Sequence, residues 1–197
     1  MFWLILFIAV WGIVHSFLAS LGFKAFVRGA LGDGFMKPYR LLYNLFAVLS
    51  FAPVLYLMIS LPDRTFYQVP PPWSYLMFAG QAISLVLLFT AVLQTDLLAF
   101  VGLRQLFEGE KSKLVISGLY RLVRHPLYTF SLLILWLSPS VTVNAFIVYA
   151  ALTLYILIGA VFEERKLQRE FGQEYINYKS ATPMLIPGWS KTPRQRG

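Results

Sequence analysis

The sequence predicts an all-α integral membrane protein, a helical bundle of about five transmembrane helices. The 197-residue chain is 58% hydrophobic and only 13% charged, whereas a soluble domain typically carries about 25% charged residues. This number of charges is too small to cover the surface of a globular protein of this size. Lipid must therefore solvate much of the chain. Long apolar runs support the same fold class, because a transmembrane helix needs roughly 20 apolar residues.

Five apolar runs are the expected spans of a single membrane domain that covers residues 1–197. Their approximate limits are 2–21, 39–61, 73–100, 122–137 and 141–162. The fourth run is short, and its helix is expected to begin at Pro126, because proline suits the first helical position and disfavours helix at the residue before it. The sequence Ser138-Pro139-Ser140 is expected to turn the chain into the fifth run.

The basic residues predict the orientation of this bundle. With five crossings and the amino terminus outside, Arg64 alone of the 17 Lys and Arg residues lies outside, as the positive-inside rule requires. We therefore expect the amino terminus outside and the carboxyl terminus in the cytoplasm. This topology explains the formal charge of +8 better than nucleic-acid binding does, so the expected partner is the lipid bilayer and no nucleic acid.

The composition excludes several kinds of site. The chain has no cysteine and two histidines, which rules out disulfides, thiolate metal sites and a cysteine nucleophile. No metal site is expected, since no metal-ligand spacing is found, and the glycines show no nucleotide-binding spacing. His15 lies inside the first run, where polar residues are functional candidates by default, but a hydrogen-bonded packing role is the simpler expectation.

A basic stretch lies at the start of the fourth run. It contains Arg121 and Arg124, and it continues through His125 and Pro126 to Tyr128. The amino-terminal end of a helix that begins at Pro126 would attract an anion such as a carboxylate. The alternative is that His125 only caps the helix and Arg124 meets a lipid phosphate.

Two carboxylates, Glu163 and Glu164, follow the fifth run. Carboxylates at a membrane boundary are costly unless they are paired or hydrated, so they need cationic partners. The partners expected for Glu164, on a solvated helical extension, are Arg165, Lys166 and Arg169. Glu163 lies closer to the bilayer and is the expected ligand for a cation or amine. With a positive wall at 121–128 and a negative wall at 163–164, the predicted cytoplasm-facing pocket suits a zwitterion.

The same residues carry a resemblance to a known family. The stretch GLYRLVRHPLY, followed later by EERKLQREFGQEYINYKSATPMLIPG, resembles the isoprenylcysteine carboxyl methyltransferase family of integral membrane enzymes. This part of the resemblance covers the chain from Gln105 on. In the amino-terminal half, HSFLAS in the first run and YRLLYN at the start of the second are similar to the bacterial NnrU and methanethiol methyltransferase branch.

The resemblance implies a methyltransferase in a bacterial inner membrane that uses S-adenosylmethionine as its cofactor. The cofactor would be bound on the cytoplasmic side by the carboxyl-terminal half, residues 101–190. The implied cofactor contacts are Gln105, Ser112, Lys113, Leu114, Val115, Tyr120, His125, Pro126, Leu127, Tyr128 and Glu163. No residue is assigned a catalytic role, because a sulfonium methyl group is already activated; His125, Arg124 and Tyr128 are candidates for positioning groups.

The methyl acceptor implied by the resemblance is small or lipophilic: a thiol, a carboxylate, an amine or a lipid. In the eukaryotic enzymes an arginine four residues before the glutamate matched by Glu163 binds the substrate carboxylate, and Gly159 stands at that position here. A prenylcysteine carboxylate is therefore not the expected acceptor. One alternative is an NADPH-dependent membrane reductase, which would need a further basic cluster. The other is a non-enzymatic membrane protein, such as a transporter-like subunit in nitrogen-oxide metabolism, which would need more ionisable residues near mid-membrane.

Overall fold

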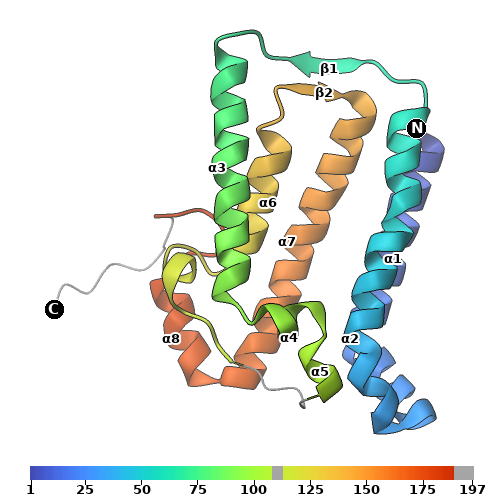
Figure 1. Ribbon diagram of the computed structural model, residues 1–197, viewed down its shortest axis with the longest axis vertical. Coiled ribbons are helices and arrows are strands. Elements are labelled where there is room, and N and C mark those ends of the chain that lie inside the picture. The colour runs from blue at the N-terminus through green and yellow to red at the C-terminus, as the bar shows by residue number, and fades with distance from the viewer. Residues whose placement is uncertain (108–112, 189–197) are drawn as a thin grey trace, which may run out of the picture. The chain divides into compact units, whose positions relative to one another are not determined.

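The computed structural model describes residues 1–107 and 113–188 and is predominantly helical (Figure 1). Within these residues the helices are α1 (Phe2–Ala19), α2 (Leu21–Ser60), α3 (Trp73–Gln94), α4 (Leu97–Val101), α5 (Arg104–Phe107), the short 3-10 helix η1 (Gly118–Arg121), α6 (Pro126–Trp136), α7 (Val143–Phe171) and α8 (Gln173–Ala181). Two short strands, β1 (Thr65–Gln68) and β2 (Ser140–Thr142), pair in one small sheet that was not predicted. The helical fold class is confirmed.

Among the described residues, α1, α2, α3 and α7 are long and apolar enough to cross a membrane. The fourth predicted run corresponds to α6, which is apolar but has only 11 residues. Large apolar side chains on these helices are widely exposed; Ile59 is 77% exposed and Leu93 72%. Apolar exposure of this extent is unusual for a protein in water and is expected for one surrounded by lipid.

Helical structure begins before the second apolar run. Helix α2 begins at Leu21, immediately after Ser20 ends α1, and the side chain of Ser20 caps it by accepting a hydrogen bond from the Phe23 N–H. Gly32 interrupts α2 with φ 79° and ψ 171°. The segment between the first two apolar runs is therefore mostly helical, which apolar-run analysis could not detect because its charged residues mark it as a loop.

Other predicted limits also need correction. The third run was expected to reach 100, but α3 ends at Gln94, and Asp96 starts α4 by accepting a hydrogen bond from the Ala99 N–H at 3.0 Å. Helix α7 continues beyond 162 to Phe171, and residues 122–125 lie outside α6. The predicted start of α6 at Pro126 is confirmed, and the chain turns at Ser138 and Pro139 as expected.

The chain forms two compact units. The first comprises Met1–Phe66, Asp96–Ser112 and Thr142–Ala151. In it, α1 and α2 pack side by side (Figure 1). The Tyr43 hydroxyl lies 2.5 Å from His15 Nε2, and the His15 ring stacks on Trp11 at 4.9 Å between centroids. This contact is the hydrogen-bonded packing role expected of His15.

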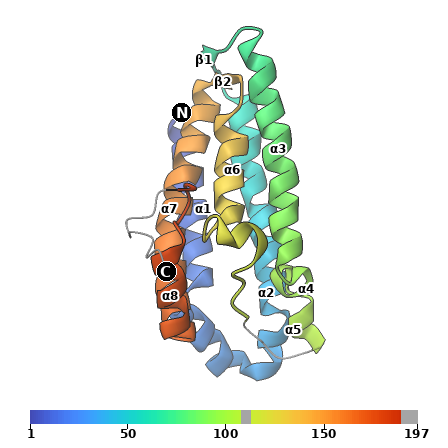
Figure 2. The same cartoon turned by 90° about the vertical axis from the view of Figure 1, so that its left-hand side faces the viewer.

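The second unit comprises Tyr67–Thr95, Lys113–Val141 and Leu152–Gly197. Helices α3 and α6 pack together in it (Figure 2). The Leu119 N–H before α6 donates to Gln94 Oε1 at the end of α3, while Gln81 near the start of α3 donates to the Ile134 carbonyl near the end of α6. These two contacts make α3 and α6 antiparallel. Trp136 at the end of α6 then donates to Thr153 Oγ1 of α7.

Candidate functional site

A buried ion cluster joins the start of α6 to α7 and α8 within the second unit. Its centre is Glu164, which is 6% exposed and lies beyond the apolar part of α7. Glu164 Oε1 accepts from Arg124 Nε at 2.7 Å and lies 2.5 Å from Arg124 Nη2, while Oε2 lies 2.8 Å from Lys179 Nζ. Helical spacing along α7 could not reveal these partners, because both come from distant segments.

Two expectations from the sequence are therefore wrong. Glu164 is held by Arg124 and Lys179, whereas its sequence neighbours Arg165, Lys166 and Arg169 had been expected to pair with it. The alternative in which His125 only caps α6 and Arg124 meets lipid also fails. The His125 side chain makes no cap hydrogen bond, and the Arg124 side chain is only 9% exposed.

Arg124 also fixes the segment that follows α8. Its Nη1 donates to the Lys179 carbonyl at 3.0 Å and to the Thr182 carbonyl, and its backbone N–H donates to the Pro183 carbonyl at 2.9 Å. The His125 N–H donates to the Met184 carbonyl at 3.2 Å. The residues after α8 thus run along the start of α6 and satisfy the backbone there.

Three predicted site residues meet beside this cluster. The Tyr128 hydroxyl donates to Glu163 Oε2 at 2.7 Å, and the His125 ring stacks on the Tyr128 ring with centroids 5.3 Å apart. His125 Nδ1 lies 3.7 Å from Glu163 Oε2. Its Nε2 lies 3.5 Å from Glu164 Oε1 and has no hydrogen-bond partner among the described residues. The Glu163 side chain is 43% exposed, so it remains accessible to a ligand.

The electrostatics of the cluster follow from these contacts. Burial by itself would raise the pKa of Glu164, but the close approach of His125, the contacts of Lys179 and Arg124, and the charge of Arg124 outweigh burial and hold that pKa at about 2. Burial, with a smaller contribution from the charge of Glu163, raises the pKa of Tyr120 to about 12. Glu164 is thus ionised and Tyr120 neutral at physiological pH.

The remaining predicted cofactor contacts are more dispersed. Gln105 belongs to the first unit, where its amide donates to the Ala99 carbonyl at 3.1 Å and its Oε1 is buried with no hydrogen-bond partner among the described residues. Ser112 lies outside the described residues. In the segment before η1, Lys113 is exposed while Leu114 and Val115 are partly buried. Pro126 and Leu127 form the first turn of α6.

Sequence reasoning missed the contribution of α8. Tyr175 is 1% exposed, Tyr178 donates from its hydroxyl to the Tyr120 carbonyl at 2.5 Å, and Lys179 binds Glu164. The spacing of these residues and Thr182 places all four on one helical face. That pattern, in the FGQEYINYKSAT stretch, could have identified α8 as a helix that packs on the site.

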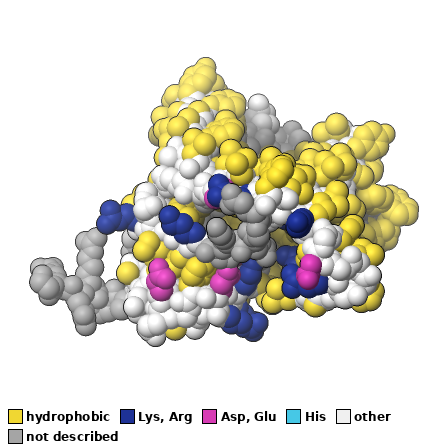
Figure 3. Space-filling model, turned by 60° about the horizontal axis from the view of Figure 1, so that its bottom comes forward, with side chains coloured by type: hydrophobic (Ala, Val, Ile, Leu, Met, Phe, Trp, Pro, Cys, Tyr) yellow, Lys and Arg dark blue, Asp and Glu magenta, His cyan; other side chains and the backbone are white. Residues whose placement is uncertain are grey.

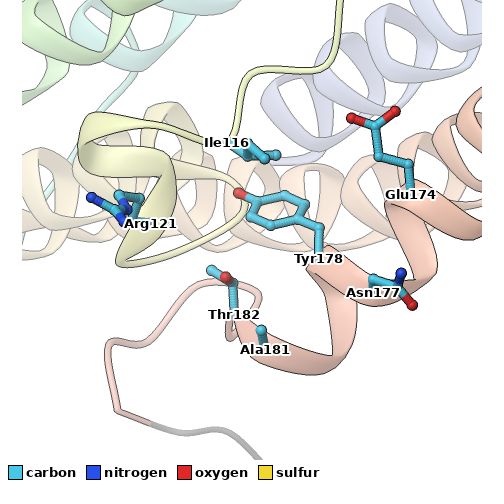
Figure 4. A pocket seen from close by; sticks show the side chains of 7 residues that line it. All are labelled: Ile116, Arg121, Glu174, Asn177, Tyr178, Ala181 and Thr182. Carbon is cyan, nitrogen blue, oxygen red and sulfur yellow. The ribbon is translucent and has the colours of Figure 1, made fainter.

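A hollow lies beside Tyr178 in the second unit. It has a volume of about 480 Å³, and its lining includes Arg121 and Glu174 together with Tyr178 (Figure 4). Arg121 was expected on the positive wall beside His125, but it lines this hollow. No residue that was predicted to contact the cofactor lines it. No group of three or more His, Cys, Asp or Glu residues that could hold a metal ion occurs in the described part of the chain.

Comparison with known proteins gives a consistent family. The family model described as NnrU protein matches residues 3–188. Methanethiol S-methyltransferase 1 of Bradyrhizobium diazoefficiens is 29% identical over 195 residues, covering 95% of this chain and 67% of that protein. Methanethiol S-methyltransferase 2 of the same organism is 35% identical over 121 residues, covering 58% of this chain and 46% of that protein.

A third relative has the same activity in its name. The methanethiol S-methyltransferase of Crocosphaera subtropica is 28% identical over 198 residues, which is 91% of this chain and 72% of that protein. The chain therefore spans only part of the length of the curated relatives that it matches. No solved structure matches the chain significantly. The predicted resemblance to the NnrU and methanethiol methyltransferase branch is confirmed, and the chain belongs to the NnrU family.

Proposed function

We propose that this protein is a membrane methyltransferase that uses S-adenosylmethionine and methylates a small thiol or another small, lipophilic acceptor. The single observation that carries this proposal is the meeting of His125, Tyr128 and Glu163 in one place, the three residues on which the family resemblance rests. The names of the relatives favour a thiol acceptor. Gly159 supports the same choice, since it leaves α7 without the arginine that would bind a prenylcysteine carboxylate.

The residues present fit the cationic part of the cofactor. Glu163 keeps an accessible carboxylate that Tyr128 orients, and such a group suits an ammonium. Arg124 does not fit the role expected of it, because Glu164 and two backbone carbonyls already engage its guanidinium. We assign the anion of a zwitterionic ligand to the amino-terminal turn of α6, while the His125 Nε2 faces Glu164 Oε1 at 3.5 Å.

When bound, S-adenosylmethionine supplies a methyl group that its sulfonium has already activated. The protein then has to align an acceptor with this group and exclude water. Tyr128 fixes Glu163 through a 2.7 Å hydrogen bond, and the carbonyls of Pro183 and Met184 satisfy the backbone beside His125. These contacts orient the site without requiring a strong base.

We further propose five membrane crossings, with the site facing the cytoplasm. In the second unit, residues Tyr67 and Val69 before α3 bond to the Ser138 and Pro139 carbonyls, whereas Gln94 at the other end of α3 bonds to the Leu119 N–H. The stretch from η1 to Pro139 therefore covers the same depth as α3 although α6 itself is short. Figure 3 shows Lys and Arg side chains, in dark blue, beside Asp and Glu side chains on one face of the structure.

Equilibrium binding of labelled S-adenosylmethionine to the purified protein in nanodiscs tests the proposed function. We expect wild type to bind, and Glu163→Gln and His125→Ala each to weaken binding by about tenfold, the loss of roughly 1.4 kcal/mol. The matched control is Glu170→Gln, because Glu170 is an exposed carboxylate on the same helix, and it should bind normally. Unchanged affinity in both site variants would remove the proposed site.

A further inference from the structure

Glu164 is the most heavily engaged charged side chain of the second unit that the family resemblance leaves without a role. It is 6% exposed, and it contacts segments that lie far away in the sequence: Arg124 before α6 and Lys179 on α8. An ion pair of this kind need not stabilise a protein overall, because desolvation offsets the attraction between the charges, but removing one partner leaves a buried charge unpaired. Its role is therefore to be sought in what it holds in place.

Glu164 holds Arg124, and Arg124 in turn holds the end of α8. Two of the guanidinium nitrogens are bound to Glu164, and the third, Nη1, donates to the Lys179 and Thr182 carbonyls. A guanidinium can satisfy a carboxylate and two carbonyls at once because its donors form a rigid planar fork. Lys179 closes the arrangement by binding the other oxygen of Glu164 at 2.8 Å.

The start of α6 depends on the same segment. The backbone N–H groups of Arg124 and His125 donate to the Pro183 and Met184 carbonyls, and Thr129 Oγ1 donates to the Leu185 carbonyl at 2.8 Å. Glu164 itself lies 3.5 Å from His125 Nε2. Loss of the Glu164 charge would release the end of α8, and with it the carbonyls that fix the backbone at His125.

We propose that Glu164 is a positioning residue, which keeps residues 182–185 closed against the start of α6 and thereby holds His125 and Tyr128 beside Glu163. This inference rests on the proposed function, because it concerns the same site. Glu163 contacts the ligand, whereas Glu164 acts through Arg124. Of these two adjacent glutamates on α7, Glu163 thus binds the ligand and Glu164 keeps residues 182–185 against the start of α6.

Amide hydrogen exchange in the ligand-free protein, measured together with affinity for S-adenosylmethionine, tests this division. Glu164→Gln should leave these residues mostly open: exchange at the Arg124 and His125 amides should approach the rate of an unprotected chain, and binding should weaken by about tenfold, because the closed fraction then falls to about a tenth. Glu163→Gln should weaken binding and leave this exchange unchanged. Arg169→Gln, an exposed charge on α7, should change neither.

A second pair of variants keeps the test decisive if Glu164→Gln does not fold. Lys179 is 42% exposed and binds one oxygen of Glu164, so Lys179→Gln should speed exchange and weaken binding less than Glu164→Gln does, with affinity lower by about threefold as the closed fraction falls to about a third. Lys179→Arg should behave as wild type. Weaker binding with unchanged exchange would make Glu164 a direct ligand, and faster exchange with unchanged binding would make it purely structural; either result overturns the proposal. If the wild-type protein does not bind S-adenosylmethionine, the proposed function is overturned. The exchange rates would still show whether Glu164 keeps residues 182–185 against the start of α6.

Discussion

At the scale of single residues, the site depends on which charges are already paired. Arg124 was expected to add positive charge beside a helix amino terminus that attracts a ligand carboxylate. In the structure its donors are taken by Glu164 and by the end of α8. Glu163 differs from its neighbour because it faces Tyr128 and remains 43% exposed. Glu163 is thus accessible and Glu164 is buried in an ion pair, although the two are adjacent and have the same charge. The sequence motif alone could not show this difference.

The low pKa of Glu164 predicts how stability depends on pH. Its folded pKa of about 2 lies below the ordinary value of 4.5, so the unfolded chain takes up the proton first as the pH falls. The stability that Glu164 contributes is complete above about pH 4.5 and is lost as the pH falls toward about 2. Chemical denaturation in detergent should show the advantage of wild type over Glu164→Gln constant from pH 5 to pH 7.

The same experiment should show that advantage shrinking below about pH 4.5. The groups that face Glu164 are Arg124, His125, Lys179 and Tyr175. Burial raises the pKa of Tyr175 to about 12, so Tyr175 stays neutral through this window. A constant difference down to pH 2.5 would contradict the assigned pKa.

At the scale of elements, the close packing of η1 against the end of α3 requires a glycine at position 118. Gly118 has φ +60°, and a Cβ there would lie 2.4 Å from Gln94 Oε1, the atom that accepts from the Leu119 N–H. We expect Gly118→Ala to lower the free energy of unfolding by about 2 kcal/mol, from backbone strain together with loss of the Gln94 contact. Thermal unfolding followed by circular dichroism measures the change.

Gly172→Ala is the matched control for that substitution. Gly172 also has positive φ, at +55°, but nothing lies within 4 Å of the position of its Cβ. Its ψ of −126° lies outside the left-handed helical region, so this variant should show a backbone cost alone of about 1–3 kcal/mol. A Gly118→Ala protein as stable as wild type would mean that the contact between η1 and α3 contributes nothing.

The elements also show what the sequence could predict. Helix α6 starts at Pro126 as expected, because proline carries that information locally. The end of α3 at Gln94 was missed because apolar residues continue beyond it, and a side-chain cap by Asp96 decides the break. Helix α8 was missed because one of its faces packs on partners that lie far away in the sequence, such as Glu164.

At the scale of the whole molecule, the membrane class was predicted from composition, and the proposed crossing by α6 depends on the segments that flank this helix. Helix α6 has 11 residues, or about 17 Å of helix, against roughly 30 Å of hydrocarbon. The contacts of Gln94 with Leu119 and of Val69 with Pro139 support the proposal that the flanking segments supply the remaining length.

The five-crossing topology can be tested directly because the chain has no cysteine. Single substitutions Arg64→Cys and Arg169→Cys place one thiol at each predicted side. A membrane-impermeant maleimide should label Arg64→Cys in intact cells and Arg169→Cys only after permeabilisation, since the positive-inside rule puts Arg169 with the basic segments. Labelling of both from outside would mean that α6 does not cross. Labelling of Arg169→Cys alone would mean that the orientation is reversed and that the proposed site, with Glu163 and Glu164, faces away from the cytoplasmic supply of S-adenosylmethionine.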